Sequence, residues 1–172
     1  AGRGVPKSET EISSVPPSIF PEYLYDRAGK AYAVAIVSQS ATFFSAHIYY
    51  GRMWLGRINW LIEDERNVMQ LADLVLFDEP LGHRPLWARI MPFLWHPPDF
   101  RQRGLGSAML SAVITQAEKL NVDAISGYVT LDDLQKTPYL LEFYEKHGFA
   151  VQRSSPPTQG TAATIYRAIQ CA

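Results

Sequence analysis

A six-residue segment at residues 101–106, RQRGLG, has the residue types and spacing of an anion-binding turn. Glycine adopts positive φ angles at little cost, so Gly104 and Gly106 allow a tight turn whose N–H groups point toward one spot. A helix is expected to begin directly after this turn, and its N-terminus contributes unpaired N–H groups and the positive end of the helix dipole. The segment therefore predicts a binding site for a phosphate or pyrophosphate group.

Two better-known glycine loops do not fit this segment. A P-loop requires GxxxxGK followed by Ser or Thr, and the turn contains no lysine that could reach a terminal phosphate. The dinucleotide-binding pattern GxGxxG requires a third small residue, but Met109 occupies that position. What remains is a pattern in which an Arg stands three residues before a GxG pair.

A second motif lies downstream at residues 141–149, with the sequence LEFYEKHGF. The two motifs, in this order and with a predicted helix and strand between them, resemble motifs A and B of the GNAT superfamily of acetyl-CoA-dependent N-acetyltransferases. Motif A of that family has the same glycine spacing, and motif B is a helix end of the form FYxxxGF. The residues HPPDF at 96–100 also match, and the resemblance covers about residues 86 to 150.

The resemblance implies acetyl-CoA as the cosubstrate and no metal. In the family, the backbone of the strand before the glycine turn pairs with the pantetheine arm in a V-shaped gap, and the turn binds the pyrophosphate. Position 137 holds Thr where the family commonly has Asn. The implied cofactor-binding residues are Leu94, Trp95, His96, Arg101, Gln102, Arg103, Gly104, Leu105, Gly106, Ser107, Thr137 and Tyr144.

Tyr144, in the second motif, is the predicted general acid. By the resemblance, its hydroxyl lies near the cofactor sulfur and donates a proton to the departing thiolate. A phenol with a pKa of about 10 is a reasonable donor to a thiolate with a pKa of about 8.5. The alternative is a packed aromatic residue whose hydroxyl satisfies a backbone group.

A general base is also needed, because an alkylamine with a pKa of about 10.4 is almost fully protonated at pH 7. The family's usual glutamate position corresponds to about Ile90, which cannot accept a proton. The predicted candidates are Glu79 and His96, with Asp78, Asp132 and Asp133 left open.

The resemblance implies an α/β fold with a mixed, mostly antiparallel central sheet and helices on both faces. Residues 32–77 are rich in aromatic and branched side chains broken by turn signals, which predicts an antiparallel meander. The helices that usually wall the family's acceptor site leave no 3.6-residue pattern before residue 100. The later predicted elements are a strand at 86–96, a helix at 104–119, a strand at 124–130 parallel to the one before the turn, a long loop at 131–137, a helix from Pro138 to Lys146 stopped by Gly148, a loop at 154–160 and a strand at 161–169.

The chain has 172 residues, of which 47% are hydrophobic, and this predicts one domain at 22–172 after a proline- and serine-rich flexible leader at 1–21. A net charge of −1 with scattered Lys and Arg argues against a nucleic-acid partner. No apolar run approaches the length of a membrane span. Cys171 is the only cysteine, so no disulfide scaffold is expected. The predicted location is cytoplasmic, or an organelle stroma or matrix if the leader is a targeting remnant.

The predicted function is transfer of an acetyl group from acetyl-CoA to a primary amine, by direct attack in a ternary complex. The alternative is a non-catalytic CoA-binding sensor or partner domain of the same fold. The acceptor class stays open among polyamines, antibiotics, peptide N-termini and lysine side chains. A monomer and a homodimer are both compatible with the sequence.

Overall fold

The computed structural model describes residues 20–40, 42–82, 100, 102–158 and 160–170. Residues 1–19 of the predicted leader and the whole predicted strand at 86–96 lie outside the described residues. The elements in chain order are β1 (Tyr23–Tyr25), β2 (Ala31–Gln39), β3 (Phe43–Tyr50), β4 (Met53–Glu63), β5 (Val68–Leu81), α2 (Leu105–Lys119), β6 (Ala124–Thr130), α3 (Leu131–Lys136), α4 (Leu140–Lys146), β7 (Ala150–Thr158) and β8 (Thr161–Ala168).

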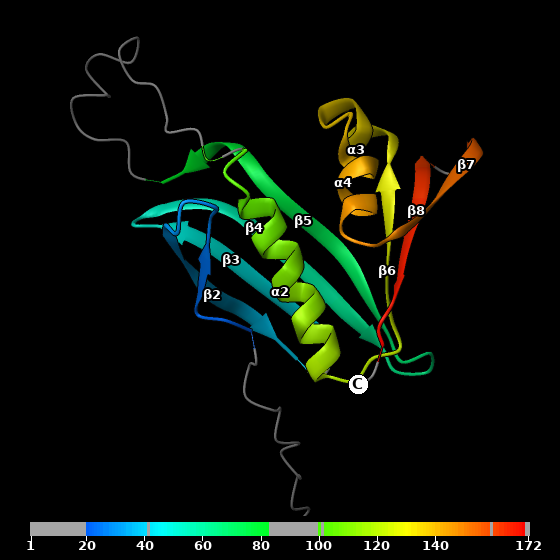
Figure 1. Cartoon of the computed structure of the whole chain (residues 1–172), viewed down its shortest axis with the longest axis horizontal. Helices are drawn as coiled ribbons and strands as arrows, with labels where there is room; N and C mark the ends of the chain where they lie inside the picture. Colours follow the sequence, from blue (N-terminus) through cyan, green and yellow to red (C-terminus); the bar gives the residue numbers. More distant parts are fainter. Residues whose placement is uncertain (1–19, 41, 83–99, 101, 159, 171–172) are drawn as a thin grey trace, which may run out of the picture.

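The strands form one sheet in the order β1-β2-β3-β4-β5-β6-β8-β7 (Figure 1). All neighbouring strands are antiparallel except β5 and β6, which are parallel and connected through α2. The predicted mixed, mostly antiparallel sheet is therefore confirmed, as is the meander at 32–77. The predicted partner of β6 is wrong, because the parallel neighbour of β6 is β5 and not a strand at 86–96.

Helix α2 has the predicted position and provides much of the core. It begins after Gly104, which has a φ of 84° that glycine adopts easily, and it ends before Asn121, which has a φ of 52°. Its apolar side chains recur every three or four residues and are buried against the sheet. The buried residues are Leu105, Met109, Leu110, Ala112, Val113, Ile114, Gln116 and Ala117.

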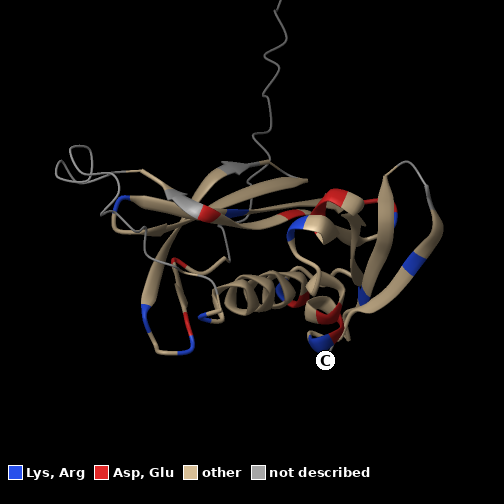
Figure 2. Cartoon of the chain, turned by 90° about the horizontal axis from the view of Figure 1, so that it is seen from above, with Lys and Arg blue, Asp and Glu red and all other residues tan. Residues whose placement is uncertain are grey.

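Helices α2 and α4 cover the same face of the sheet (Figure 2). Side chains alternate along a strand, so Ile58 and Trp60 of β4 point to the helices and join the core, whereas Arg57 and Asn59 point to the opposite face. The sheet thus has a helix-covered face and a face on which the described residues place no helix. The sequence predicts helices on both faces. Among the described residues, helices cover only the face that carries α2 and α4.

The region after β6 differs from its prediction. Residues 131–136 form helix α3 instead of a long loop, because Thr130 caps the helix and Asp133 completes a capping box. Helix α4 begins at Leu140, so Pro138 lies in the turn before it, and Gly148 ends the motif with a φ of 80° as expected. Strand β7 continues to Thr158, where a loop was predicted.

The end of the predicted leader belongs to the fold. Phe20 is buried, and its ring packs against that of Trp60 with 5.0 Å between centroids. Between Phe20 and Leu81, the described residues contain strands and turns but no helix, so the family's acceptor-wall helices are absent from that part of the chain. No helix within the described ranges has the length and apolar character needed to cross a membrane.

Candidate active site

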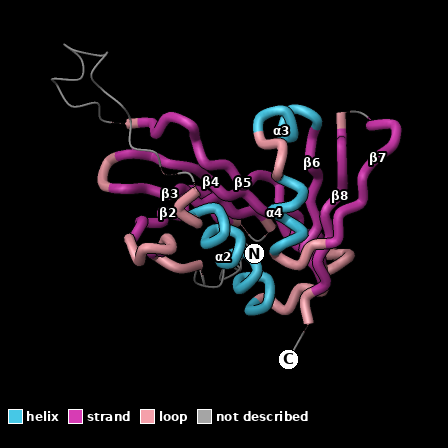
Figure 3. The backbone as a smooth tube through the Cα atoms, turned by 45° about the horizontal axis from the view of Figure 1, so that its top comes forward, coloured by secondary structure: helices cyan, strands magenta, loops and turns pink. Residues whose placement is uncertain are grey.

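The site lies where β5 and β6 part. The two strands pair only from Val68 to Leu71 on β5, opposite Ala124 to Gly127 on β6, and then diverge, with α3 and α4 in the interval (Figure 3). The cause is visible in the register of β4 with β5. Leu71 is opposite Trp60 but Asp73 is opposite Asn59, so Ala72 is an extra residue that bends β5.

The predicted gap between parallel strands is therefore present, but β5 forms its wall. The residues that border it are Leu74, Val75 and Leu76, about twenty positions before the predicted ones. Leu94, Trp95 and His96, which were expected to pair with pantetheine, lie outside the described residues. The apolar segment at 86–96 is the one nearest the glycine turn and fits the family's site strand by sequence, but β5 is the strand that borders the gap.

The glycine turn forms the predicted cradle at the N-terminus of α2. Gly104 is the N-cap residue, no side chain caps the helix, and the first turn closes with the Ala108 N–H donating to the Gly104 carbonyl at 3.0 Å. The preceding N–H groups of the helix have no intrahelical acceptor. Gly106 is different from its prediction: it lies inside the helix without a positive φ, and a Cβ placed there would be 3.8 Å from the Phe143 ring.

A cavity of about 400 Å³ lies in front of this helix N-terminus. It brings together six of the predicted cofactor-binding residues: Gln102, Gly104, Leu105, Gly106, Ser107 and Thr137. The remaining lining residues come from the β1–β2 turn, β5, the position before the glycine turn and the α4 region: Arg27, Leu74, Leu76, Phe100, Tyr139, Leu140 and Phe143. Arg103 does not line the cavity, and Arg101 lies outside the described residues.

Arg27 is a site residue that the sequence did not reveal. Its N–H donates to the Arg103 carbonyl at 2.9 Å, and its side chain covers Gly104 so closely that a Cβ there would be 2.7 Å from Arg27 Cγ. The turn that carries Arg27 is held by Asp26, whose carboxylate accepts from the Lys30 N–H at 2.9 Å and the Tyr32 hydroxyl at 2.8 Å. These hydrogen bonds lower the pKa of Asp26. A guanidinium from a distant hairpin thus joins the cradle.

Two further cavities extend from the cradle toward Tyr144. One of about 560 Å³ lies between β5 and α3 and shares Leu74, Leu76, Thr137 and Leu140 with the first. The other, of about 100 Å³, contains Tyr144 and shares Leu74 and Leu140 with both. The shared lining residues make the three cavities neighbours along one side of β5. They form a path from the N-terminus of α2 to the hydroxyl of motif B.

Tyr144, on α4, lies at the end of this path. It is 6% exposed, and its ring packs edge-on against Phe143 and Phe149, each with 5.5 Å between centroids. Its hydroxyl makes no hydrogen bond with any residue that the structure describes. Burial raises the pKa of Tyr144 well above its ordinary value, and the charges of Asp133 and Asp73 raise it further. The phenol therefore keeps its proton at neutral pH.

Two carboxylates line the same small cavity as Tyr144. Asp133 was an open candidate, and the α3 capping box holds it: its Oδ2 accepts from the Thr130 N–H at 2.9 Å and the Thr130 hydroxyl at 2.7 Å. Asp73 was missed, although it is the only charged residue in the apolar run LADLVLF of β5. It forms an ion pair with Arg57 at 2.6 Å.

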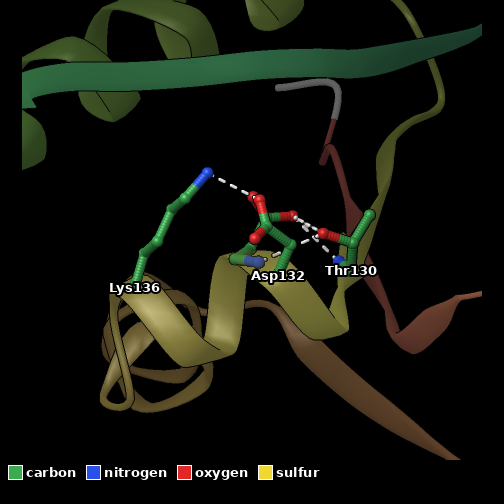
Figure 4. A network of polar contacts seen from close by, with 4 residues as sticks. Thr130, Asp132 and Lys136 are labelled. Carbon is green, nitrogen blue, oxygen red and sulfur yellow. Dashed lines mark hydrogen bonds and ion pairs between the residues drawn. The ribbon is translucent and has the colours of Figure 1, made fainter.

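Of the other candidate bases, the described side chains of Asp132 and Asp78 do not line this cavity. Asp132 pairs with Lys136 at 2.6 Å on exposed α3 (Figure 4). Asp78 lines the cavity between β5 and α3 but not the one with Tyr144. Glu79 belongs to β5, but its side chain is outside the described part of the structure, as is His96.

Comparison with solved structures gives the same architecture. The chain is similar to a Bacillus subtilis acetyltransferase in complex with CoA, with 10% identity and a TM-score of 0.54 over 81% of this chain and 99% of that one. It is also similar to PaiA N-acetyltransferase from Thermoplasma acidophilum in complex with coenzyme A, with 16% identity and a TM-score of 0.49 over 74% of this chain and 61% of that one. An acetyltransferase from Thermus thermophilus has the same identity and TM-score, over 74% and 64%.

This chain therefore spans less than two thirds of the length of the last two proteins. No curated protein matches it. A family model described as the acetyltransferase (GNAT) domain matches residues 56–151, more than half of the 172 residues. The match includes β5 with its bulge, the glycine turn and Tyr144. The chain belongs to the GNAT acetyltransferase domain family.

Proposed function

We propose that this protein transfers an acetyl group from acetyl-CoA to a primary amine, by direct attack with both substrates bound. The observation that carries the proposal is the path along β5, which joins an uncapped helix N-terminus to a buried tyrosine that has no hydrogen-bond partner among the described residues. One end of such a path suits a pyrophosphate. The other end suits a reaction that requires a proton donor away from water.

The residues of the cradle fit the cofactor on their own chemistry. The N-terminal N–H groups of α2 and the positive end of its dipole would bind the pyrophosphate, and the Arg27 guanidinium would add charge-assisted hydrogen bonds. The backbone of β5 at 74–76 borders the gap, so its peptide groups are available to an extended amide-containing arm. Thr137 stands between these two regions, since it lines both cavities.

The bound cosubstrate would supply an acetyl thioester, whose carbonyl carbon forms a C–N bond with the amine as the C–S bond breaks. Tyr144 would give its proton to the leaving sulfur, which its burial permits because the phenol stays protonated at neutral pH. Asp73 and Asp133 would accept the proton that the amine must lose, since both line the cavity of Tyr144. In this proposal Asp73 and Asp133 act as general bases instead of Glu79 and His96.

The test combines a thiol-release assay, with acetyl-CoA and a panel of primary amines, and calorimetric titration of acetyl-CoA. Binding together with turnover of at least one amine would support the proposal. Tight binding without turnover of any amine would favour a CoA-binding sensor domain. Absence of acetyl-CoA binding would contradict both the transferase and the sensor function, because each requires the cradle to hold the cofactor.

A further inference from the structure

The face of the sheet opposite α2 carries a patch of side chains in three rows across β3, β4 and β5. The register sets the rows: Ser45, Asn59 and Asp73 form the first, and His47, Arg57 and Val75 form the second. Tyr49 and Trp54 are opposite each other in the third, where Phe77 contacts Trp54. Since Asp73 and Val75 also line the cavity of Tyr144, the patch begins at the mouth of the proposed reaction site.

Aromatic rings in mutual contact form the part of the patch farthest from Asp73. The His47 ring stacks on Trp54 with 4.3 Å between centroids and an interplanar angle of 22°. Phe77 meets Trp54 edge-on at 4.8 Å, and the Trp54 indole N–H is held by the Gly56 carbonyl at 2.8 Å. These contacts fix the rings in place, so they present a preformed aromatic surface.

The patch has little net charge. Asp73 is the one acidic side chain in the three rows, and Arg57 already neutralises it at 2.6 Å. Burial and the neighbouring Arg57 lower the pKa of His47, which favours the uncharged form of its ring. An acceptor with several ammonium groups would need a surface of negative charge, which these rows do not provide.

The spacing of the rows matches a short amine. The row of His47 lies two residues from the row of Asp73 along each strand, which is about 6.6 Å. A two-carbon chain between a ring and an amino group spans a comparable length. A ring against His47, which itself stacks on Trp54, would therefore bring its amino group toward Asp73 and the cavity of Tyr144.

We infer that the acceptor is a small monoamine with a flat aromatic body, bound by the aromatic rows of β3 and β4 with its amino group beside Asp73. This inference rests on the proposed function and names its substrate class. It sets aside polyamines, whose charges the patch does not match, and peptides whose first residue has no aromatic side chain to place on this patch.

The first experiment compares four acceptors in the thiol-release assay: 2-phenylethylamine, 2-cyclohexylethylamine, spermidine and a pentapeptide with a free N-terminal alanine. We expect kcat/KM to be highest for 2-phenylethylamine, by about tenfold or more over spermidine and the peptide, because only this acceptor combines a flat ring with a short reach. The cyclohexyl compound, which has the same length but no flat ring, should fall between them.

The second experiment asks whether Trp54 is the contact. Trp54→Leu should raise KM for 2-phenylethylamine about tenfold with acetyl-CoA affinity unchanged, and Trp54→Phe, which keeps a ring, should restore most of the loss. Tyr166→Leu is the matched control, since Tyr166 is an exposed aromatic of β8 on the far side of the β5–β6 gap.

Preference for spermidine or the peptide, or equal KM values in Trp54→Leu and wild type, would overturn this inference and leave the proposed acetyl transfer standing. Turnover of none of the four amines, with acetyl-CoA bound, would overturn this inference, and the wider panel of primary amines would then decide the proposed acetyl transfer. A Trp54→Leu variant that does not fold leaves the acceptor comparison in the wild-type protein to decide.

Discussion

The two faces of the sheet beside the β5–β6 gap are built from different kinds of contact. On the helix-covered face, the cradle is formed by backbone: a glycine in the left-handed region, the uncapped N-terminus of α2 and the peptide groups of β5. On the opposite face, the patch is formed by side chains from three strands, with stacked rings and one ion pair. Tyr144 lies between the two, in the cavity that also contains Asp73.

The difference teaches how one fold can keep a cosubstrate and change its acceptor. Backbone groups present the same atoms whatever side chains follow, so the cofactor face depends on a few residues that permit the turn. Each side chain of the opposite face can change without disturbing the ladder of hydrogen bonds beneath it. Variants on the two faces should therefore separate cofactor binding from acceptor binding.

The largest effect is expected at the point where the two faces meet. Tyr144→Phe should lower kcat by about 10² to 10³ while the affinity for acetyl-CoA and the KM of the amine change little, because only the proton donor is lost and the ring still packs. Steady-state kinetics with calorimetry measure this. Tyr166→Phe, which removes an exposed hydroxyl outside the site, serves as the control. Full activity in Tyr144→Phe would contradict the acid role.

The cofactor face can be tested by a pair of glycines. Gly104 and Gly160 have nearly equal φ values of 84° and 81°, but only Gly104 has Arg27 within contact distance of an added Cβ. Gly104→Ala and Gly160→Ala should both destabilise the fold by about 1 kcal/mol. Only Gly104→Ala should also weaken acetyl-CoA binding, by about tenfold or more, because Arg27 must move. Equal affinities in the two variants would show that Arg27 and this turn do not bind the cofactor.

The acceptor face can be tested at Asp73. Asp73→Asn should lower kcat/KM for the amine about tenfold, a smaller loss than at Tyr144 because Asp133 remains in the same cavity to accept a proton. Calorimetry should find acetyl-CoA affinity unchanged. A matched Asp64→Asn variant, in the exposed β4–β5 turn, should behave as wild type. A loss of cofactor affinity in Asp73→Asn would contradict the assignment of Asp73 to the acceptor face alone.

The smallest effect concerns pH. The pKa of Tyr144 is raised above its ordinary value of 10.0, so the phenol keeps its proton at pH values where a free tyrosine begins to lose it. The rate should therefore rise with pH as the amine deprotonates and should not decline below about pH 10. Because the pKa of Tyr144 is raised in the folded state, Tyr144 stabilises the fold below about pH 10. This contribution to the free energy of unfolding is lost as pH rises through the folded-state pKa. A decline of the rate near pH 8 would contradict a buried tyrosine acid.

Much of the fold could be predicted because it depends on short-range pattern. The strand meander, the helix ending at Lys119 and the strand at 124–130 follow from periodicity and from turn residues such as Asn121. Helix α3 was missed, although Thr130 and Asp133 stand three residues apart as in a capping box. The capping-box spacing is present in the sequence, but the prediction placed residues 131–137 in a loop.

By itself, the sequence determined the glycine turn, the position of Tyr144 and the family, because each depends on residues that are close together in the chain. Steric rules for Gly104 and the helix that follows act within one turn of backbone. Only the tertiary structure decided that β5 borders the gap, that Arg27 reaches the cradle, and that Asp73 shares a cavity with Tyr144. Arg27 and Gly104 are 77 positions apart, and Asp73 and Tyr144 are 71 positions apart. Their contacts follow from strand register and a single bulge, which no local pattern specifies.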